Sequence, residues 1–220
     1  LLLTSMKINT TVKRWRGLLE AAKHNDDETV KYWVQERGAV VAKVNARNQT
    51  AAHLATGNNN LGMLKYLIHH KKPPKNPRKA LIRMKDADGL TIFHVAVRKG
   101  AINIIKYLLD DLDANIDPFE PLEHHPMNNA IHTAAEYGYL EVLRYLIAEK
   151  HGDPNVINKF QESPIFLAVE EEYNQVVKYL VEEANANVTL TNWNRNNILH
   201  YASYKGNLNI TKYLLDERRI

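Results

Sequence analysis

The tripeptide Lys-Tyr-Leu recurs along this 220-residue chain and limits what the chain can fold into. Its full copies begin at Lys65, Lys106, Lys178 and Lys212, with near copies at residues 31–33 and 144–146. The steps between copies are 34, 41, 38, 34 and 34 residues. A period in this range indicates a stack of similar units, each of which buries its hydrophobic face against its neighbours. The two longer steps place insertions after Leu67 and Leu108.

A second motif precedes each Lys-Tyr-Leu copy. Its fullest example runs from Asp86 to Ala96 and reads D-A-D-G-L-T-I-F-H-V-A. This sequence resembles the ankyrin repeat, whose pattern is D-x-x-G-x-T-P-L-H-x-A. The resemblance extends from about Trp15 to Leu215. It implies an all-α repeat solenoid, in which helix-turn-helix units alternate with hairpin-like fingers.

We therefore expect an N-terminal extension at residues 1–12 and one repeat domain at 13–220. A basic, proline-rich insertion is expected at 69–85 and an acidic insertion at 110–125. The approximate repeat boundaries are 13–44, 45–85, 86–123, 124–157, 158–191 and 192–220.

The residue before each first helix is expected to cap it. Thr, Asn and Ser all carry a side-chain oxygen that accepts a hydrogen bond from an otherwise unpaired backbone N–H. The expected N-cap residues are Thr50, Thr91, Asn129, Ser163 and Asn197.

The turn after each first helix should contain a residue that tolerates left-handed backbone. Glycine or asparagine suits this position, and five of the six turns have one. Glu172 does not fit, so we expect a strained turn there. The suitable residues are Asn25, Asn59, Gly100, Gly138 and Gly206.

Four histidines recur at one internal position, namely His53, His94, His132 and His200. Their separation by whole repeats argues against a shared metal site or a catalytic base, which need convergent side chains. The resemblance implies that each bonds to backbone between neighbouring repeats. No cysteine is present, which excludes disulfides and thiolate zinc sites and fits a reducing interior. We expect no metal, no cofactor and no catalytic residue.

Charge is divided along the chain. Residues 1–100 have nineteen Lys/Arg and seven Asp/Glu, whereas residues 101–220 have ten and eighteen, so the net charges are +12 and −8. The basic insertion contains three prolines, which predict an extended loop without a helix. The simplest interpretation of the basic insertion is a solvated loop without a binding role. The alternatives are a nuclear import signal or a polyanion-binding patch. The polyanion-binding candidates are Lys71, Lys72, Lys75, Arg78, Lys79, Arg83 and Lys85.

The resemblance places partner contacts on the fingers and the first helices, which form the concave face in this family. Four aromatic residues at these positions, Tyr137, Phe160, Trp193 and Tyr204, are predicted to form one exposed patch, since Trp and Tyr dominate interface hot spots. The alternative without a binding role is that each aromatic ring packs onto its own repeat. The full set of protein-binding candidates is Arg47, Gln49, Leu90, Arg98, Lys99, His125, Tyr137, Phe160, Glu170, Glu171, Trp193, Tyr204 and Lys205.

These observations favour a non-catalytic protein–protein interaction module or adaptor with a protein partner. We expect the chain to be monomeric and to have no membrane span. One alternative is nucleic-acid or other polyanion binding through the basic half. Another is the repeat domain of a larger effector or enzyme whose catalytic part lies elsewhere, since the chain starts without Met and is expected to be a fragment. We expect an intracellular location, cytoplasmic or nuclear, or the host cytoplasm for a bacterial effector.

Overall fold

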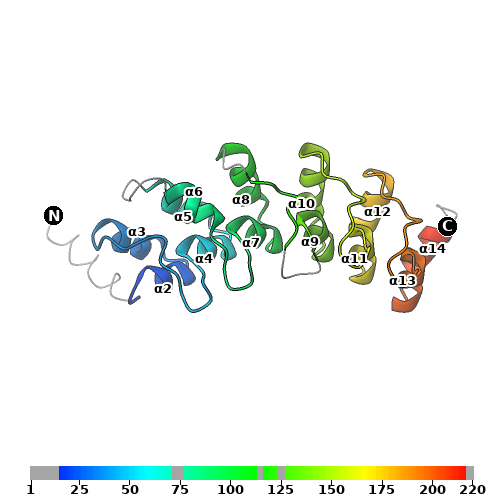
Figure 1. The fold of residues 1–220 in the computed structure, drawn as a ribbon, viewed down its shortest axis with the longest axis horizontal. Coiled ribbons are helices and arrows are strands. Elements are labelled where there is room, and N and C mark those ends of the chain that lie inside the picture. The colour runs from blue at the N-terminus through cyan, green and yellow to red at the C-terminus, as the bar shows by residue number, and fades with distance from the viewer. Residues whose placement is uncertain (1–14, 71–76, 113–115, 123–126, 217–220) are drawn as a thin grey trace. The chain divides into compact units, whose positions relative to one another are not determined.

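A computed structural model describes residues 15–70, 77–112, 116–122 and 127–216. The chain divides into two compact units, residues 1–114 (unit 1) and 115–220 (unit 2). Each unit is built of successive antiparallel helix pairs (Figure 1). The described residues contain helices and one isolated β-bridge between Val44 and Thr50. The predicted all-α repeat fold is therefore confirmed.

In unit 1 the first helix α4 packs against both α2 and α7, and the second helices α3, α5 and α8 pack on the first helices of their own pairs. The helix α8 continues into a π-helical turn, η1. The bounds are α2 Leu18–Lys23, α3 Asp27–Gln35, α4 Ala51–Gly57, α5 Leu61–His69, α6 Pro77–Arg83, α7 Ile92–Arg98, α8 Ile102–Lys106 and η1 Tyr107–Asp111.

In unit 2 the helix α11 is central and packs against both α9 and α13. Here α10 also continues into a π-helical turn, η2. The bounds are α9 Ala130–Glu136, α10 Leu140–Arg144, η2 Tyr145–Glu149, α11 Pro164–Glu170, α12 Asn174–Glu182, α13 Ile198–Lys205 and α14 Leu208–Asp216. None of the helices in the described ranges is long and apolar enough to cross a bilayer.

All five predicted residues stand at the N-cap positions. The predicted bond to a backbone N–H is confirmed for Thr50, Asn129 and Asn197, whereas the Ser163 hydroxyl makes no such bond. The Thr50 hydroxyl oxygen accepts a hydrogen bond from the His53 N–H at 3.3 Å. Asn129 Oδ1 accepts from the N–H groups of Ile131 and His132 at 3.0 and 3.2 Å. Polar caps of this kind fix where each first helix begins and therefore fix the spacing of the repeats.

Two of the four repeated histidines, His53 and His132, perform the structural role that the resemblance implies. The Nε2–H of His53 donates to the carbonyl of Leu90, 37 residues later, at 3.1 Å. The Nε2–H of His132 donates to the carbonyl of Glu162, also at 3.1 Å. In each case Nδ1 accepts a backbone N–H from the cap residue of the same helix. The ring thus links the start of one first helix to the finger of the following repeat.

The turns after the first helices adopt the predicted left-handed backbone. Asn25 and Asn59 have φ of 58° and 54°, and Glu172, the predicted misfit, has φ of 61°. A side chain other than Gly, Asn or Asp costs roughly 1 kcal/mol in this conformation. Gly138 has φ of 72°, and a Cβ there would lie 2.6 Å from the Tyr173 ring, so this turn also needs glycine for space.

The Lys-Tyr-Leu copies form contacts between successive second helices. The leucine of each copy is buried in the core, and the tyrosines of the later repeats are nearly so. Lys65 Nζ lies 4.7 Å from the centre of the Tyr107 ring, one repeat later. Arg144 lies 4.5 Å above Tyr179, and the Lys178 ammonium lies 5.7 Å from the Tyr213 ring. Each of these three cations therefore lies on the tyrosine of the next repeat, a favourable contact between successive repeats.

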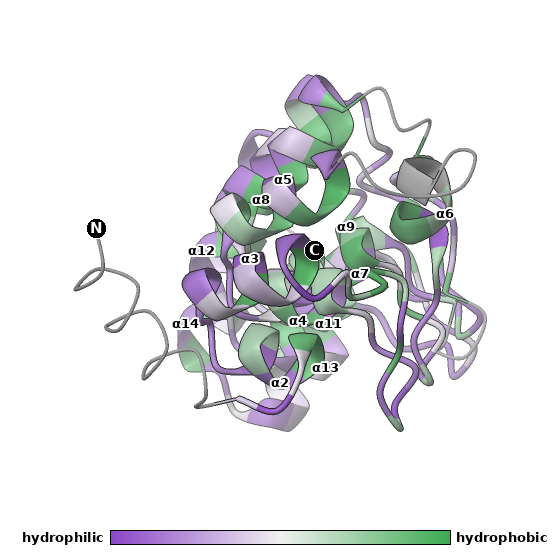
Figure 2. Ribbon diagram, turned by 90° about the vertical axis from the view of Figure 1, so that its left-hand side faces the viewer, coloured by the Kyte–Doolittle hydropathy of each residue, from purple (hydrophilic) through white to green (hydrophobic). Residues whose placement is uncertain are grey.

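The basic insertion departs from its prediction. Residues 77–83 form the helix α6, although three prolines were expected to exclude a helix. Pro77 occupies the first helical position, where the missing N–H costs nothing. Leu81 and Ile82 are each 2% exposed, and α6 packs on α5 and α7. Figure 2 shows the hydrophobic colour of α6 beside α7. Burial of these two side chains explains why this part of the insertion is ordered as a helix.

Candidate functional site

Two neighbouring fingers of unit 2 are held rigid by asparagine side chains. In finger 5 (residues 158–163), Asn158 Oδ1 accepts from the N–H groups of Phe160 and Glu162 at 2.8 and 3.1 Å. In finger 6 (residues 192–197), Asn192 Oδ1 accepts from the N–H groups of Asn194 and Asn196 at 3.0 and 3.1 Å. Such side-chain bonds to the backbone fix a turn, so the fingers present their tips in a defined geometry.

The finger tips bring Phe160 and Trp193 together. Their ring centres lie 6.3 Å apart with an interplanar angle of 86°, an edge-to-face contact. The Trp193 N–H also donates to the Phe160 carbonyl at 3.1 Å, which joins the two fingers through the backbone. Even so, Phe160 is 42% and Trp193 is 64% exposed. The pair is thus preorganised and still accessible.

Behind these fingers lies a buried carboxylate. Glu162 is 9% exposed. Its Oε1 accepts from the Tyr201 hydroxyl at 2.7 Å and from Asn192 Nδ2 at 3.4 Å, and its Oε2 accepts from Asn158 Nδ2 at 3.4 Å. Burial, and then the hydrogen bond to the Glu162 carboxylate, raise the pKa of Tyr201 to about 12. Tyr201 therefore stays protonated at neutral pH and continues to donate to the carboxylate.

A cleft of about 420 Å³ opens beside α13. Tyr204, which is 88% exposed, projects at its rim. Lys205 Nζ lies 3.8 Å from Glu170 Oε1, a long distance for an ion pair. We call this feature the α13 cleft. Its lining residues are Glu170, Asn196, His200, Tyr201, Tyr204 and Lys205.

The structure groups several of the predicted contact residues in unit 2. Phe160 and Trp193 touch each other, and Glu170, Tyr204 and Lys205 share the α13 cleft. Finger 6 joins the two groups, since it supplies both Trp193 and the lining residue Asn196. Tyr137 instead stacks on Tyr139, with ring centres 6.0 Å apart.

The remaining contact candidates lie elsewhere. Arg47 and Lys99 are exposed in unit 1, whereas Gln49 and Arg98 are half-buried there. Glu171 is exposed at the end of α11. His125 lies outside the described residues. The prediction for Leu90 was wrong: its side chain is only 3% exposed, so it offers almost no surface to a partner.

Sequence reasoning missed Glu162, Tyr201, Asn196 and His200. Glu162 stands in finger 5, and no motif in the sequence marks its carboxylate as buried. Its bonds reach Asn192 and Tyr201, 30 and 39 residues later. The recurrence of asparagine at 158 and 192, one repeat apart, was the available signal for a polar network there.

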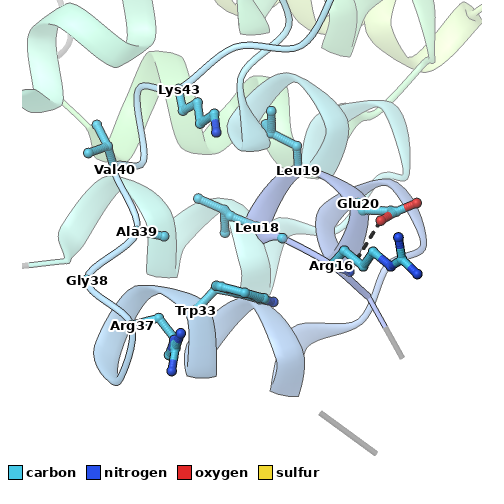
Figure 3. A pocket seen from close by; sticks show the side chains of 11 residues that line it. Arg16, Leu18, Leu19, Glu20, Trp33, Arg37, Gly38, Ala39, Val40 and Lys43 are labelled. Carbon is cyan, nitrogen blue, oxygen red and sulfur yellow. Dashed lines mark hydrogen bonds between the residues drawn. The ribbon is translucent and has the colours of Figure 1, made fainter. Parts of the chain in front are cut away.

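Unit 1 contains a second cavity, of about 550 Å³. Trp33, Leu18 and Val40 supply apolar lining, and Lys43 also lines the cavity (Figure 3). The Arg37 guanidinium lies 5.8 Å from the Trp33 ring centre. The Arg16 N–H donates to the Glu20 carboxylate at 3.3 Å, as the dashed line in Figure 3 marks. The cavity combines cations with an apolar surface.

The polyanion-binding candidates are described only in part. Lys71, Lys72 and Lys75 lie outside the described residues, and Arg78 and Lys79 are within the range of α6. Arg83 and Lys85 are exposed. In the described parts of the chain, no group of three histidine or carboxylate side chains is placed to hold a metal ion.

The family model "Ankyrin repeats (3 copies)" matches residues 18–120 and again residues 127–220. The crystal structure of EF0377, an ankyrin repeat protein, is similar with a TM-score of 0.71 and 25% identity, over 91% of this chain and 96% of that chain.

A chain from the complex of the Bd0816 predatory endopeptidase from Bdellovibrio bacteriovorus with the immunity protein Bd3460 is similar in fold. Its TM-score is 0.74 at 20% identity, over 91% of this chain and 97% of that one. Ankyrin repeats are, as a class, protein-interaction modules. Because the family model matches both units almost completely, the chain belongs to the ankyrin-repeat family.

Proposed function

We propose that this chain is a non-catalytic protein-interaction module whose contact surface in unit 2 consists of the Phe160–Trp193 pair and the adjoining α13 cleft. The observation that carries this proposal is the edge-to-face pair itself, which is held at 6.3 Å and remains exposed. A tryptophan whose side chain is already ordered loses little conformational entropy on binding. Most of the free energy gained by burying it therefore contributes to affinity. Tryptophan and tyrosine are also enriched among interface hot spots.

The rigidity of the fingers supports this role. The Asn158 and Asn192 side chains fix both turns, and the Trp193–Phe160 backbone bond fixes one finger against the other. A partner therefore binds two aromatic rings that folding has already fixed in position. The structure of similar fold in the endopeptidase–immunity protein complex also supports a protein as the class of partner.

The experiment is affinity capture from nuclease-treated lysate with three baits. These are the wild type, the double variant Phe160→Ala/Trp193→Ala, and the control Leu208→Ala/Leu215→Ala. The control removes two exposed side chains of α14, which are 70% and 47% exposed. Truncation of a hot-spot residue costs about 2 kcal/mol or more, roughly 30-fold in affinity. A partner retained by wild type and control but lost by the double variant is the expected result.

Equal retention by all three baits would refute the proposed surface. Capture only when nuclease is omitted would favour the polyanion alternative. In that case the binding constant should fall steeply with salt, because phosphate contacts release counterions.

A further inference from the structure

The α13 cleft lies in front of a buried negative charge. Among the residues that the structure describes, the hydrogen-bond donors to Glu162 are neutral groups, namely Tyr201, Asn192 and Asn158. Neutral donors stabilise a carboxylate without cancelling its charge. Because Tyr201 both bonds to Glu162 and lines the cleft, the negative potential of this carboxylate extends into the cleft.

Glu170 adds a second carboxylate at the rim. Within the part of the chain that the structure describes, Glu170 pairs with Lys205 at 3.8 Å, whereas strong charge-assisted pairs are about 2.7–2.9 Å. The surrounding unit is acidic as well, since residues 115–220 have nine Lys/Arg and fifteen Asp/Glu, a net charge of −6. A cationic segment is therefore attracted to this unit before it makes contact.

Aromatic rings complete the site. Tyr201 is half-buried and Tyr204 is 88% exposed, and both line the cleft. The face of a tyrosine ring attracts a cation, and a planar guanidinium stacks on it more favourably than an ammonium does. Guanidinium also presents paired N–H groups that suit a carboxylate such as Glu170. An arginine side chain satisfies all of these features at once.

We propose that the α13 cleft binds an arginine side chain of a basic segment in the protein partner, with its guanidinium against Tyr204 and paired to Glu170. This inference rests on the proposed function, because it names the chemistry of the partner at that surface. The cleft of about 420 Å³ accommodates the side chain together with part of the flanking residues.

The test is a titration of the whole chain, labelled with nitrogen-15, with the peptide acetyl-Gly-Arg-Gly-amide, followed by amide chemical shifts. The expected result is saturable shifts at Glu170, Tyr204 and Lys205. The citrulline peptide, which has nearly the same shape without the charge, should give no saturable shifts. The lysine peptide should bind at least fivefold more weakly, because it lacks the planar fork.

Variants locate the binding. Glu170→Gln and Tyr204→Ala should each weaken arginine-peptide binding at least fivefold. The control Glu141→Gln removes the same charge from the exposed face of α10 and should leave binding unchanged. Equal weakening by Glu170→Gln and Glu141→Gln would overturn the proposal, because it would reveal only the general acidity of the unit. Equal binding of the arginine and citrulline peptides would overturn it too.

The two proposals fail separately. If the arginine peptide does not bind while Phe160→Ala/Trp193→Ala still abolishes capture, the protein-binding surface stands and the arginine site is wrong. If the peptide binds at the cleft but that double variant captures the partner normally, the proposed surface is wrong.

Discussion

Acid should destabilise unit 2 through one side chain, His132. This ring is completely buried, and both of its nitrogens are hydrogen-bonded, to the Glu162 carbonyl and the Asn129 N–H. Burial lowers the pKa of His132 from 6.5 to about 4; the Glu162 carbonyl and carboxylate act in the opposite direction but do not cancel it. The unfolded chain, in which the ring is solvated, takes up the proton at the ordinary pKa.

The size of this loss of stability follows from the difference between the folded-state and unfolded-state pKa of His132. Since the folded-state pKa is lowered, the stabilisation is fully present above pH 6.5 and is lost as the pH falls toward 4. Each unit of pKa difference corresponds to about 1.4 kcal/mol. Lowering the pH from 7.5 to 4 should therefore remove about 3 kcal/mol of unfolding free energy through this residue.

The assay is urea denaturation followed by circular dichroism, between pH 4 and 7.5, for wild type and His132→Phe. Phenylalanine is a suitable replacement because Phe166 occupies the equivalent position in the next repeat and is fully buried there. The variant loses two hydrogen bonds at every pH but has no group to titrate at this position. Carboxylates and His53, whose pKa is also lowered by burial, contribute to both proteins and cancel in the comparison. Identical pH dependence of the two proteins would refute the reasoning.

Three further substitutions test separate features of the structure. Glu172→Gly should raise the melting temperature by about 2–4 °C in a thermal scan, because glycine relieves roughly 1 kcal/mol of left-handed strain at φ 61°; a lower melting temperature would contradict the strained turn. Leu81→Ala should cost about 2–4 kcal/mol in urea denaturation, because the side chain is 2% exposed; no measurable cost would contradict the packing of α6. Tyr201→Phe should cost about 1–3 kcal/mol in the same assay, because it removes the 2.7 Å hydrogen bond to buried Glu162, and an unchanged midpoint would contradict that network.

The repeat fold and its local rules could be predicted from the sequence because each signal recurs. Thr50, Asn129 and Asn197 share one chemistry at one position, so the five cap positions could be identified from the sequence, although the Ser163 hydroxyl makes no cap bond. The positive φ of Glu172 could be predicted for the same reason, since its counterparts are glycine or asparagine. Recurrence averages out the ambiguity of any single segment.

The features that occur once were harder to predict. In the basic insertion, the three prolines led to the prediction of a loop, and the short apolar sequence at Leu81 and Ile82 did not indicate a helix. Burial of these two side chains in the tertiary structure stabilises α6. Glu162 looks like a surface acid, and only the approach of residues 30 and 39 positions away makes it a buried acceptor. Repeat register placed Phe160 and Trp193 of the proposed contact surface on neighbouring fingers, but the cleft depends on side-chain positions that register does not specify.

The cation–tyrosine contacts between second helices have a mechanical consequence. Lys65 is covalently part of one repeat, but its favourable interaction is with the Tyr107 ring of the next, and Arg144 and Lys178 repeat this offset with Tyr179 and Tyr213. When a terminal repeat is pulled away under tension, the cation–tyrosine contact between it and the adjoining repeat therefore breaks. Within each unit, extension should proceed repeat by repeat, and every detachment should leave the adjoining repeat easier to detach.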